Sequence, residues 1–373
     1  MAPTRTPRLI TVAAAQLGPN NKDASREAIL ARLLKHMDDA AAQGARLIAF
    51  PELALTTFFP VMLLRDEEAG RYFEPASAAR PYGVLETPHG RPLVEKADAL
   101  GMDFYLGYAE RWAADGASSS STTDFNTALY YSAAARRPVA KYRKVHLPGT
   151  AEPLADPAAY QQLEKRYFAP GNLGFRAFRA PGLVEGAVKA EDVVVGVGVG
   201  GADAESSSSS STEGKGDPIL GMLICNDRRW PEAWRAYGLQ GAELVIEGYN
   251  TTAWAPQYEG TPEQQTADAE FHHRLSCQAG SYHNAAWSIN VAKCGRENGQ
   301  WMIGGSMIVD PNGKVVAESK TLDDELVVAT IDLSLCRKGK ERVFNFEKHR
   351  RVDQYGIILE QVGAKEIPLL SRS

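Results

Sequence analysis

Short apolar runs alternate with amphipathic helical patterns along this chain, and this alternation limits the possible folds more than any other feature of the sequence. Residues 9–15 and 47–50 form strand-like apolar runs. Between them, residues 25–42 carry apolar side chains at helical spacing, namely Ile29, Leu33, Leu34 and Met37. Strands and helices that alternate in this way are typical of α/β proteins. We therefore predict an α/β fold.

Two stretches of low complexity interrupt the pattern. Residues 116–123 and 182–217 are rich in Gly and Ser, and the second contains the serine tract 206–211. Such a composition buries too little apolar area to offset the entropy of ordering, so we predict two surface insertions. The Gly-rich run 196–201 lacks the lysine of a phosphate-binding loop and leads into serines, which disfavours nucleotide binding.

The composition is typical of a soluble enzyme. The 373 residues are 44% apolar and carry a formal charge of -5, which gives no basis for a nucleic-acid partner. No run approaches the roughly 18 apolar residues of a membrane-spanning helix, and residues 1–8 lack the apolar core of a signal peptide. We expect a cytoplasmic protein with no membrane partner.

The cysteines predict reduced thiols rather than disulfides or a metal site. No Cys-x-x-Cys spacing occurs among the four, which are Cys225, Cys277, Cys294 and Cys336. His272 and His273 are adjacent rather than spaced to share one metal ion, so we predict that they pack or form hydrogen bonds. No metal is expected.

Cys225 lies where a catalytic nucleophile is usually presented. It follows the apolar run 219–224, and residues 230–232 predict a turn into a helix, because proline is tolerated in the first helical turn. The guanidinium groups of Arg228 and Arg229, with helix N-terminal amides, are expected to favour the thiolate. The alternative is a cysteine that packs as a small apolar side chain. This segment alone does not decide between them.

Two other segments place charged side chains at or near strand ends. Glu52 follows a strand-like run and Pro51, in the position of a base, although a carboxylate at a helix start has the same pattern. The alternating segment 139–148 puts Tyr142, Lys144 and His146 on one face. A solvated edge strand is the alternative for that segment. Together with the cysteine, Glu and Lys make a coherent nucleophile, base and electrophile.

The chain resembles the nitrilase superfamily of carbon-nitrogen hydrolases. That superfamily uses a Glu after Phe-Pro, a Lys two residues before a His and a Cys at a strand end, which correspond to Glu52, Lys144 and Cys225. Within it, the chain is most similar to the N-carbamoyl-D-amino acid amidohydrolases. The segments that carry this resemblance are FPELALTTFFP (50–60), KYRKVHLPG (141–149), LEKRYF (163–168), ICNDRRWPE (224–232) and GYNT (248–251).

The resemblance implies a four-layer α-β-β-α sandwich, in which two mixed sheets lie face to face between helices. It implies a single carbon-nitrogen hydrolase domain over residues 9–360, with tails at 1–8 and 361–373 and the two insertions at about 116–123 and 182–217. Members of the family pair through helices, so we expect a homodimer or homotetramer. The implied chemistry needs no cofactor and acts on a small-molecule substrate.

The implied mechanism is acyl transfer through a covalent thioester. Glu52 takes a proton from Cys225 and later from water, while the Lys144 ammonium and the backbone amide of Asn226 stabilise the oxyanion. The resemblance also places Glu164 beside this triad, where it orients water or the lysine. A salt bridge from Glu164 to one of the two basic residues that follow it is the open alternative.

Substrate-binding side chains are expected close to the nucleophile. Arg228 and Arg229 follow it by three and four residues, so at least one guanidinium is predicted to hold a substrate carboxylate by two hydrogen bonds. The resemblance adds Asn250 and Thr251 to this set.

Two further positions are predicted to belong to the pocket. The related bacterial enzymes carry His where this chain has Gln162, which forms hydrogen bonds but carries no charge and moves no proton, so substrate affinity or preference is expected to differ. His146 is retained and is predicted to support Glu52 or Lys144.

The predicted function is hydrolysis of N-carbamoyl amino acids, of the D series, to the amino acid, ammonia and carbon dioxide. One alternative is a related hydrolase of a β-ureido acid, a carboxylate-bearing amide or a nitrile, although the arginine pair disfavours neutral nitriles. The other alternative is a non-catalytic scaffold relative, against which the joint presence of Glu52, Lys144 and Cys225 argues.

Overall fold

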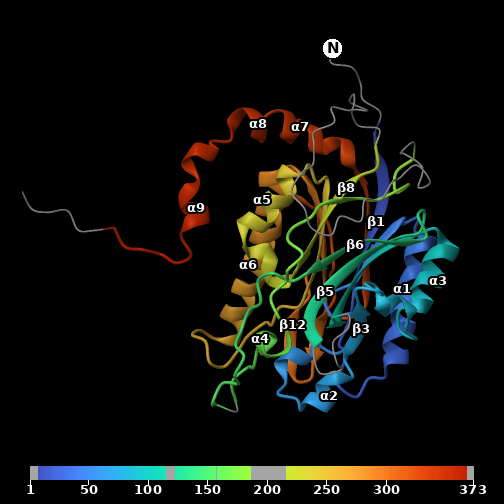
Figure 1. Cartoon of the computed structure of the whole chain (residues 1–373), viewed down its shortest axis with the longest axis vertical. Coiled ribbons are helices and arrows are strands. Elements are labelled where there is room, and N and C mark those ends of the chain that lie inside the picture. Colours follow the sequence, from blue (N-terminus) through green and yellow to red (C-terminus); the bar gives the residue numbers. More distant parts are fainter. Residues whose placement is uncertain (1–6, 115–121, 157, 186–215, 368–373) are drawn as a thin grey trace, which may run out of the picture.

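The computed structural model describes residues 7–114, 122–156, 158–185 and 216–367. Most of both low-complexity stretches and the last residues of the chain therefore lie outside the described residues. Within the described part, two β-sheets form the centre of the molecule and helices cover their outer faces (Figure 1). This arrangement confirms the predicted α/β sandwich.

The first sheet carries seven strands among the described residues. Its order is β15 (Glu325–Asp332), β1 (Leu9–Gln16), β2 (Leu47–Ala49), β4 (Asp103–Ala113), β5 (Thr122–Ser132) and β6 (Arg137–Arg143), and β3 (Phe73–Ser77) pairs with β4. Strands β1, β2 and β4 run parallel. Strand β15 pairs antiparallel with β1, β5 pairs antiparallel with β4, and β6 pairs antiparallel with β5. The predicted strands 9–15 and 47–50 are the central strands β1 and β2.

The second sheet carries six strands of the described chain. Its order is β14 (Val315–Glu318), β13 (Met307–Val309), β10 (Trp287–Ala292), β9 (Leu244–Tyr249), β8 (Ile219–Ile224) and β7 (Phe178–Arg179). Strands β8, β9 and β10 are parallel. A separate hairpin pairs β11 (Cys294–Glu297) with β12 (Gln300–Ile303).

Strand β1 shows why the sheets pack face to face. Val12 and Ala14 point into the core between the two sheets, whereas Ala13 and Ala15 point into a second core under the helices. Because both faces of the strand are buried, its sequence is a continuous apolar run rather than an alternating one. Helices α1 (Arg26–Ala42) and α3 (Arg91–Leu100) cover this outer face.

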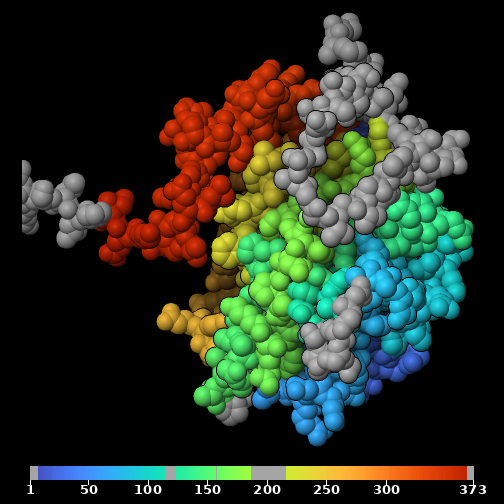
Figure 2. Space-filling view, viewed as in Figure 1, coloured from blue at the N-terminus to red at the C-terminus, as the bar shows by residue number. Residues whose placement is uncertain are grey.

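The outer face of the second sheet is covered by α5 (Pro231–Leu239) and α6 (Pro262–Asn284). The remaining helices are short: α2 (Asp66–Gly70), α4 (Glu164–Tyr167), α7 (Cys336–Glu341), α8 (Phe346–His349) and α9 (Gly356–Glu360). Residues 342–367, which we call the C-terminal arm, leave the sandwich and arch past α5 and α6, as the red segment of Figures 1 and 2 shows. No described helix is both long and apolar enough to cross a bilayer.

Candidate active site

The nucleophile candidate, Cys225, ends strand β8 and begins a tight turn over Cys225–Arg229. Its φ of 50° is left-handed, a conformation that is costly for a residue with a side chain and that recurs where a nucleophile is presented on a sharp turn. The turn leads into α5 at Pro231, which confirms the predicted strand, turn and helix. The buried thiol donates a hydrogen bond to the carbonyl oxygen of Asn250 at 3.2 Å.

Glu52 lies on the loop after β2, and two glycines allow this loop to approach the sheets closely. A Cβ atom at Gly248 of β9 would lie 2.7 Å from the Glu52 backbone nitrogen, and one at Gly107 of β4 would lie 2.6 Å from the Pro51 carbonyl oxygen. Real Cβ atoms do not approach this closely, so any larger residue would displace the loop. These two glycines are positioning residues. Gly248 belongs to the segment 248–251 that carries the family resemblance, whereas no sequence motif singled out Gly107, which is isolated in a strand.

Lys144 joins two carboxylates in the interior. Its Nζ lies 2.8 Å from Glu52 Oε1 and 2.5 Å from Glu164 Oε2, and all three side chains are fully buried. Lys144 immediately follows edge strand β6, yet it points inward, so the solvated-edge alternative is wrong for this residue. Glu164 pairs with Lys144, and not with either basic residue that follows it.

Two amides fix the orientation of the Glu52 carboxylate. Asn126 Nδ2 donates to Oε1 at 2.7 Å, and Asn250 Nδ2 donates to Oε2 at 3.1 Å and to the Glu52 carbonyl at 3.0 Å. Asn250, predicted as a substrate ligand, therefore holds the Glu52 side chain in place. Its Oδ1 is buried and has no hydrogen-bond partner in the described structure.

Burial and neighbouring charges shift the ionisation of these groups. Burial raises the pKa of Glu164, an effect that the Lys144 ammonium opposes and the Glu52 carboxylate reinforces. Burial alone would lower the pKa of Lys144, but the charges of Glu164 and Glu52 outweigh it and raise that pKa. Lys144 therefore stays an ammonium, a group that can stabilise an oxyanion.

Arg228 favours the Cys225 thiolate as expected, but burial outweighs this effect. Burial, followed by the charge of Glu52, raises the pKa of Cys225 to about 11, although Lys144 and Arg228 act in the opposite direction. The resting group at neutral pH is therefore a thiol. The buried Glu52 carboxylate has the chemistry of a group that can accept its proton.

The two adjacent arginines have different environments. Arg228 is buried, and its guanidinium donates to the Cys225 carbonyl at 2.7 Å and to Thr251 Oγ1 at 2.8 Å. It also pairs with Glu247 at 3.3 Å and lies over the Tyr249 ring. Arg228 therefore holds the nucleophile turn, which corrects its prediction as a carboxylate ligand.

Arg229, in contrast, is exposed and lines the same cavity as Cys225. Among residues that the structure describes, none forms a hydrogen bond or an ion pair with its guanidinium. It is thus the member of the pair that is available to an incoming anion.

The cavity at the thiol has a volume of about 290 Å³. Of the predicted residues, it is lined by Cys225, Asn226, Arg229, Gln162, Asn250 and Thr251. Several other lining residues were not predicted to belong to the site, namely Tyr160, Trp254, Tyr258, Gln265, Asp268 and His272, the last of which was predicted only to pack or form hydrogen bonds. Three of these belong to α6, a helix whose relation to the nucleophile depends on the tertiary fold.

His146 lies elsewhere than predicted. Its Nδ1 is 2.8 Å from Asp227 Oδ1, and its ring stacks on Trp230 at 4.8 Å between centroids. It contacts neither Glu52 nor Lys144 through a hydrogen bond and does not line the cavity. Its carbonyl accepts a hydrogen bond from Asn226 Nδ2 at 3.1 Å, so this residue ties the loop after β6 to the nucleophile turn. No three potential metal ligands are grouped in the described chain.

Comparison with known proteins agrees with this geometry. The carbon-nitrogen hydrolase family model matches residues 11–341. A nitrilase of Pyrococcus abyssi is 26% identical over 93% of this chain and 99% of its own. An N-carbamoylputrescine amidase of Solanum tuberosum is 25% identical over 96% of this chain and 98% of its own.

A solved carbon-nitrogen hydrolase from Helicobacter pylori has the same fold, with a TM-score of 0.68 at 18% identity over 95% of this chain and 99% of that one. The family match spans both sheets and every element that carries Glu52, Lys144, Glu164 and Cys225. The chain therefore belongs to the carbon-nitrogen hydrolase family.

Proposed function

We propose that this carbon-nitrogen hydrolase removes the carbamoyl group from N-carbamoyl-D-amino acids. The observation that carries the proposal is the unpartnered guanidinium of Arg229, which lines the same 290 Å³ cavity as the Cys225 thiol. A guanidinium in a small cavity matches a carboxylate, because its planar donors fit both oxygens. The sequence segments shared with N-carbamoyl-D-amino acid amidohydrolases support the D series.

The first half of the reaction forms a covalent intermediate. Cys225 Sγ attacks the ureido carbon as Glu52 takes the thiol proton, and the oxyanion is stabilised by the Lys144 ammonium and the Asn226 backbone N–H. Asn250 Oδ1, which is buried and unpaired within the described structure, accepts a hydrogen bond from a ureido N–H. The carbon-nitrogen bond then breaks, and the proton on Glu52 passes to the departing amino acid.

The second half releases the carbamoyl group. Water gives a proton to Glu52 and attacks the S-carbamoyl carbon, and the carbon-sulfur bond breaks to restore the thiol. The product, carbamate, decomposes to ammonia and carbon dioxide. Glu164, paired with Lys144, keeps that ammonium in position through both halves.

The test is ammonia release from paired N-carbamoyl-D- and N-carbamoyl-L-amino acids, with Cys225→Ala as the blank. We expect the unmodified protein to release ammonia from the D compounds and Cys225→Ala to release none. This result would show that Gln162 is compatible with the activity. If neither series is hydrolysed while iodoacetamide still labels Cys225, the proposal fails.

A second candidate is another amidase activity of the family, on a β-ureido acid or a carboxylate-bearing amide. Arg229 fits any such carboxylate, and relatives of this chain are named for N-carbamoylputrescine, a ureido compound that carries an amine rather than a carboxylate. β-Ureidopropionate, simple ω-amido acids and N-carbamoylputrescine therefore form the second substrate panel in the same assay.

Replacement of Arg229 by Gln is expected to raise KM for the carboxylate substrate about tenfold or more, because one charge-assisted pair is lost. The change in kcat should be smaller, since the guanidinium binds a group that does not react. The measurement is kcat and KM with the best N-carbamoyl amino acid, and Arg235→Gln on α5, which does not line this cavity, is the matched control. A KM unchanged in Arg229→Gln would contradict the assignment.

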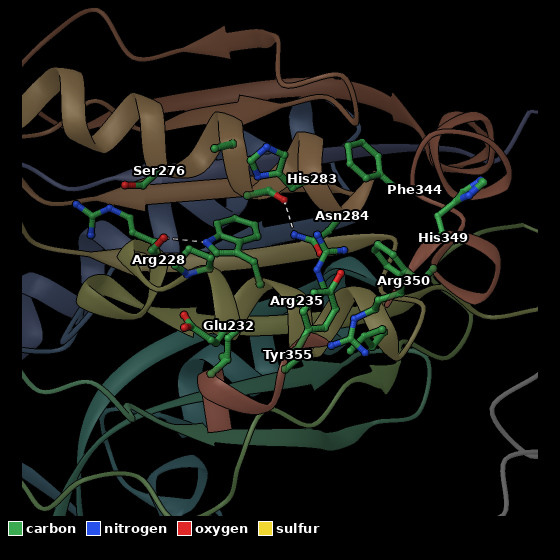
Figure 3. A pocket seen from close by; sticks show the side chains of 18 of the residues that line it. Arg228, Glu232, Arg235, Ser276, His283, Asn284, Phe344, His349, Arg350 and Tyr355 are labelled. Carbon is green, nitrogen blue, oxygen red and sulfur yellow. Dashed lines mark hydrogen bonds between the residues drawn. The ribbon is translucent and has the colours of Figure 1, made fainter. Parts of the chain in front are cut away.

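We also propose that a second copy of the chain docks against α5, α6 and the C-terminal arm. A groove of about 670 Å³ lies between them, and side chains from α5, α6 and the arm face its space (Figure 3). The arm reaches the body through Arg235 over the Phe346 ring and Tyr282 against Phe344. Beyond these contacts the arm exposes apolar side chains that a monomer leaves in water, among them Ile357, Ile358, Leu359 and Val362.

Light scattering is therefore expected to give at least twice the chain mass. The double substitution of Ile358 and Leu359 by Asp should shift the species toward the monomer, because charges in an apolar interface are not solvated. Leu63→Asp, at an exposed leucine outside the groove, is the matched control. A monomer in the unmodified protein would refute the dimer.

A further inference from the structure

One face of α6 forms a wall of the catalytic cavity. Gln265, Asp268, Ala269 and His272 all line it, and their spacing of three and four residues places them on a single helix face. Cys225 and Arg229, on the turn after β8, line the same cavity. A substrate bound at the thiol is therefore within the cavity that this face of α6 lines.

Among the described residues that line this cavity, Asp268 and Arg229 are the two whose side chains are acidic or basic at neutral pH. The described structure contains no ion pair that neutralises the Asp268 carboxylate, either with Arg229 or with any other cation. Opposite charges that share a small cavity without pairing leave both available to a ligand. A ligand that satisfies both carries an anion at one end and a cation at the other.

Aromatic side chains complete the α6 side of the cavity. Trp254 and Tyr258, on the segment that leads into α6, line it together with Asp268. Aromatic faces pack well against an aliphatic stem and attract a cation at its tip. This wall therefore has the features that a long basic side chain requires.

We infer that Asp268 is a specificity-determining residue that selects N-carbamoyl amino acids with a cationic side chain, of the lysine, ornithine or arginine class. Arg229 takes the α-carboxylate, Asp268 takes the side-chain ammonium or guanidinium, and the ureido carbon lies at Cys225. This inference rests on the function proposed above. It adds the side-chain class, which the catalytic residues alone do not determine.

The test compares two substrates that differ at one group. Nα-carbamoyl-D-lysine ends in an ammonium, and N-carbamoyl-D-2-aminoheptanoate carries a methyl group in its place. The unmodified protein should prefer the lysine compound by about two- to fivefold in kcat/KM, the effect of one ion pair at an exposed position. In Asp268→Asn this preference should fall to about one, and Asp268→Glu should retain most of it.

Glu270→Gln is the matched control, because Glu270 lies on the same helix and carries the same charge but does not line the cavity. Its substrate preference should equal that of the unmodified protein. The role of Asp268 is refuted if both substrates are hydrolysed and Asp268→Asn keeps the preference for the lysine compound. It is also refuted if the unmodified protein hydrolyses both substrates equally well. In either case the proposed function stands. If neither substrate is hydrolysed by any variant, the proposed function fails and this inference with it.

Discussion

Replacement of Glu52 by Gln is expected to lower kcat by about 10³-fold, the contribution of a positioned general base. The amide keeps the shape of the side chain, and its oxygen still accepts hydrogen bonds from Lys144 and Asn126. It cannot accept the thiol proton. Because the pKa of Cys225 is raised to about 11, few thiols ionise at neutral pH without that acceptor.

The same substitution should lower the pKa of the nucleophile. After burial, the charge of Glu52 is the next cause that raises the pKa of Cys225, so its removal favours the thiolate. Alkylation by iodoacetamide as a function of pH measures this pKa, with Cys225→Ala as the background. The expected signature is thus opposite in sign for the two readouts: the thiol ionises at lower pH while hydrolysis is lost.

Glu110→Gln is the control for this signature. Glu110 is also a fully buried carboxylate that pairs with cations, Lys141 and Arg143, but it is not among the charges that act on Cys225. The substitution should leave the pH dependence of alkylation unchanged. An unchanged alkylation profile in Glu52→Gln, or retained hydrolysis, would remove Glu52 from its role as the base.

Replacement of Lys144 by Met is expected to destabilise the protein by about 3–5 kcal/mol at pH 8, the usual result when one partner of a buried ion pair is removed. The carboxylates of Glu52 and Glu164 would then be buried without their shared cation. Hydrolysis should also fall by about 10²-fold or more, because the oxyanion loses its ammonium partner. Urea unfolding and ammonia release measure the two effects.

The destabilisation in Lys144→Met should depend on pH. Loss of the ammonium raises the folded-state pKa of Glu164 further, since that charge lowers it in the unmodified protein. A carboxyl group with a raised folded-state pKa holds its proton more tightly in the folded protein than in the unfolded chain. The folded state is therefore destabilised as pH rises and this carboxyl must ionise, and the destabilisation is relieved as pH falls. The difference in unfolding free energy should therefore be smaller at pH 5 than at pH 8.

Lys35→Met supplies the control, because Lys35 pairs with Asp39 on the exposed face of α1. Its loss should change the unfolding free energy little at either pH. Equal destabilisation by Lys144→Met at both pH values would contradict the buried pairing of Lys144 with two carboxylates.

The strands that carry the site residues, and the turn after Cys225, were predicted from the pattern of apolar and polar residues in the sequence. The apolar runs of β1, β2 and β8 predicted buried strands, because their residues bury side chains on both faces. The turn after Cys225 followed from the polar break and Pro231, which fix where a strand stops and a helix begins. Strand and turn patterns depend on residues that are neighbours in the chain, and for that reason they can be predicted from the sequence.

Other features depended on residues that are distant in sequence. The ionisation of Cys225 was predicted from its arginine neighbours, but burial and Glu52 dominate it. The α6 wall of the cavity, with Asp268, follows from the packing of α6 beside the nucleophile turn rather than from a motif. Gly107 and Gly248 gained their role only where two sheets bring backbones into contact around the Glu52 loop.

Arg228 and Arg229 separate what the sequence determined from what the tertiary structure decided. The sequence by itself established the α/β fold, the strand-end cysteine and a cationic pair beside it. It could not distinguish two adjacent arginines, because they share every local feature. The tertiary structure decided between them: strand β9 and the segment after it place Glu247 and Thr251 against Arg228, which becomes buried, whereas Arg229 lines the cavity. Burial and long-range charge pairing arise only once the sheets have packed, so they are properties of the fold and not of the local sequence.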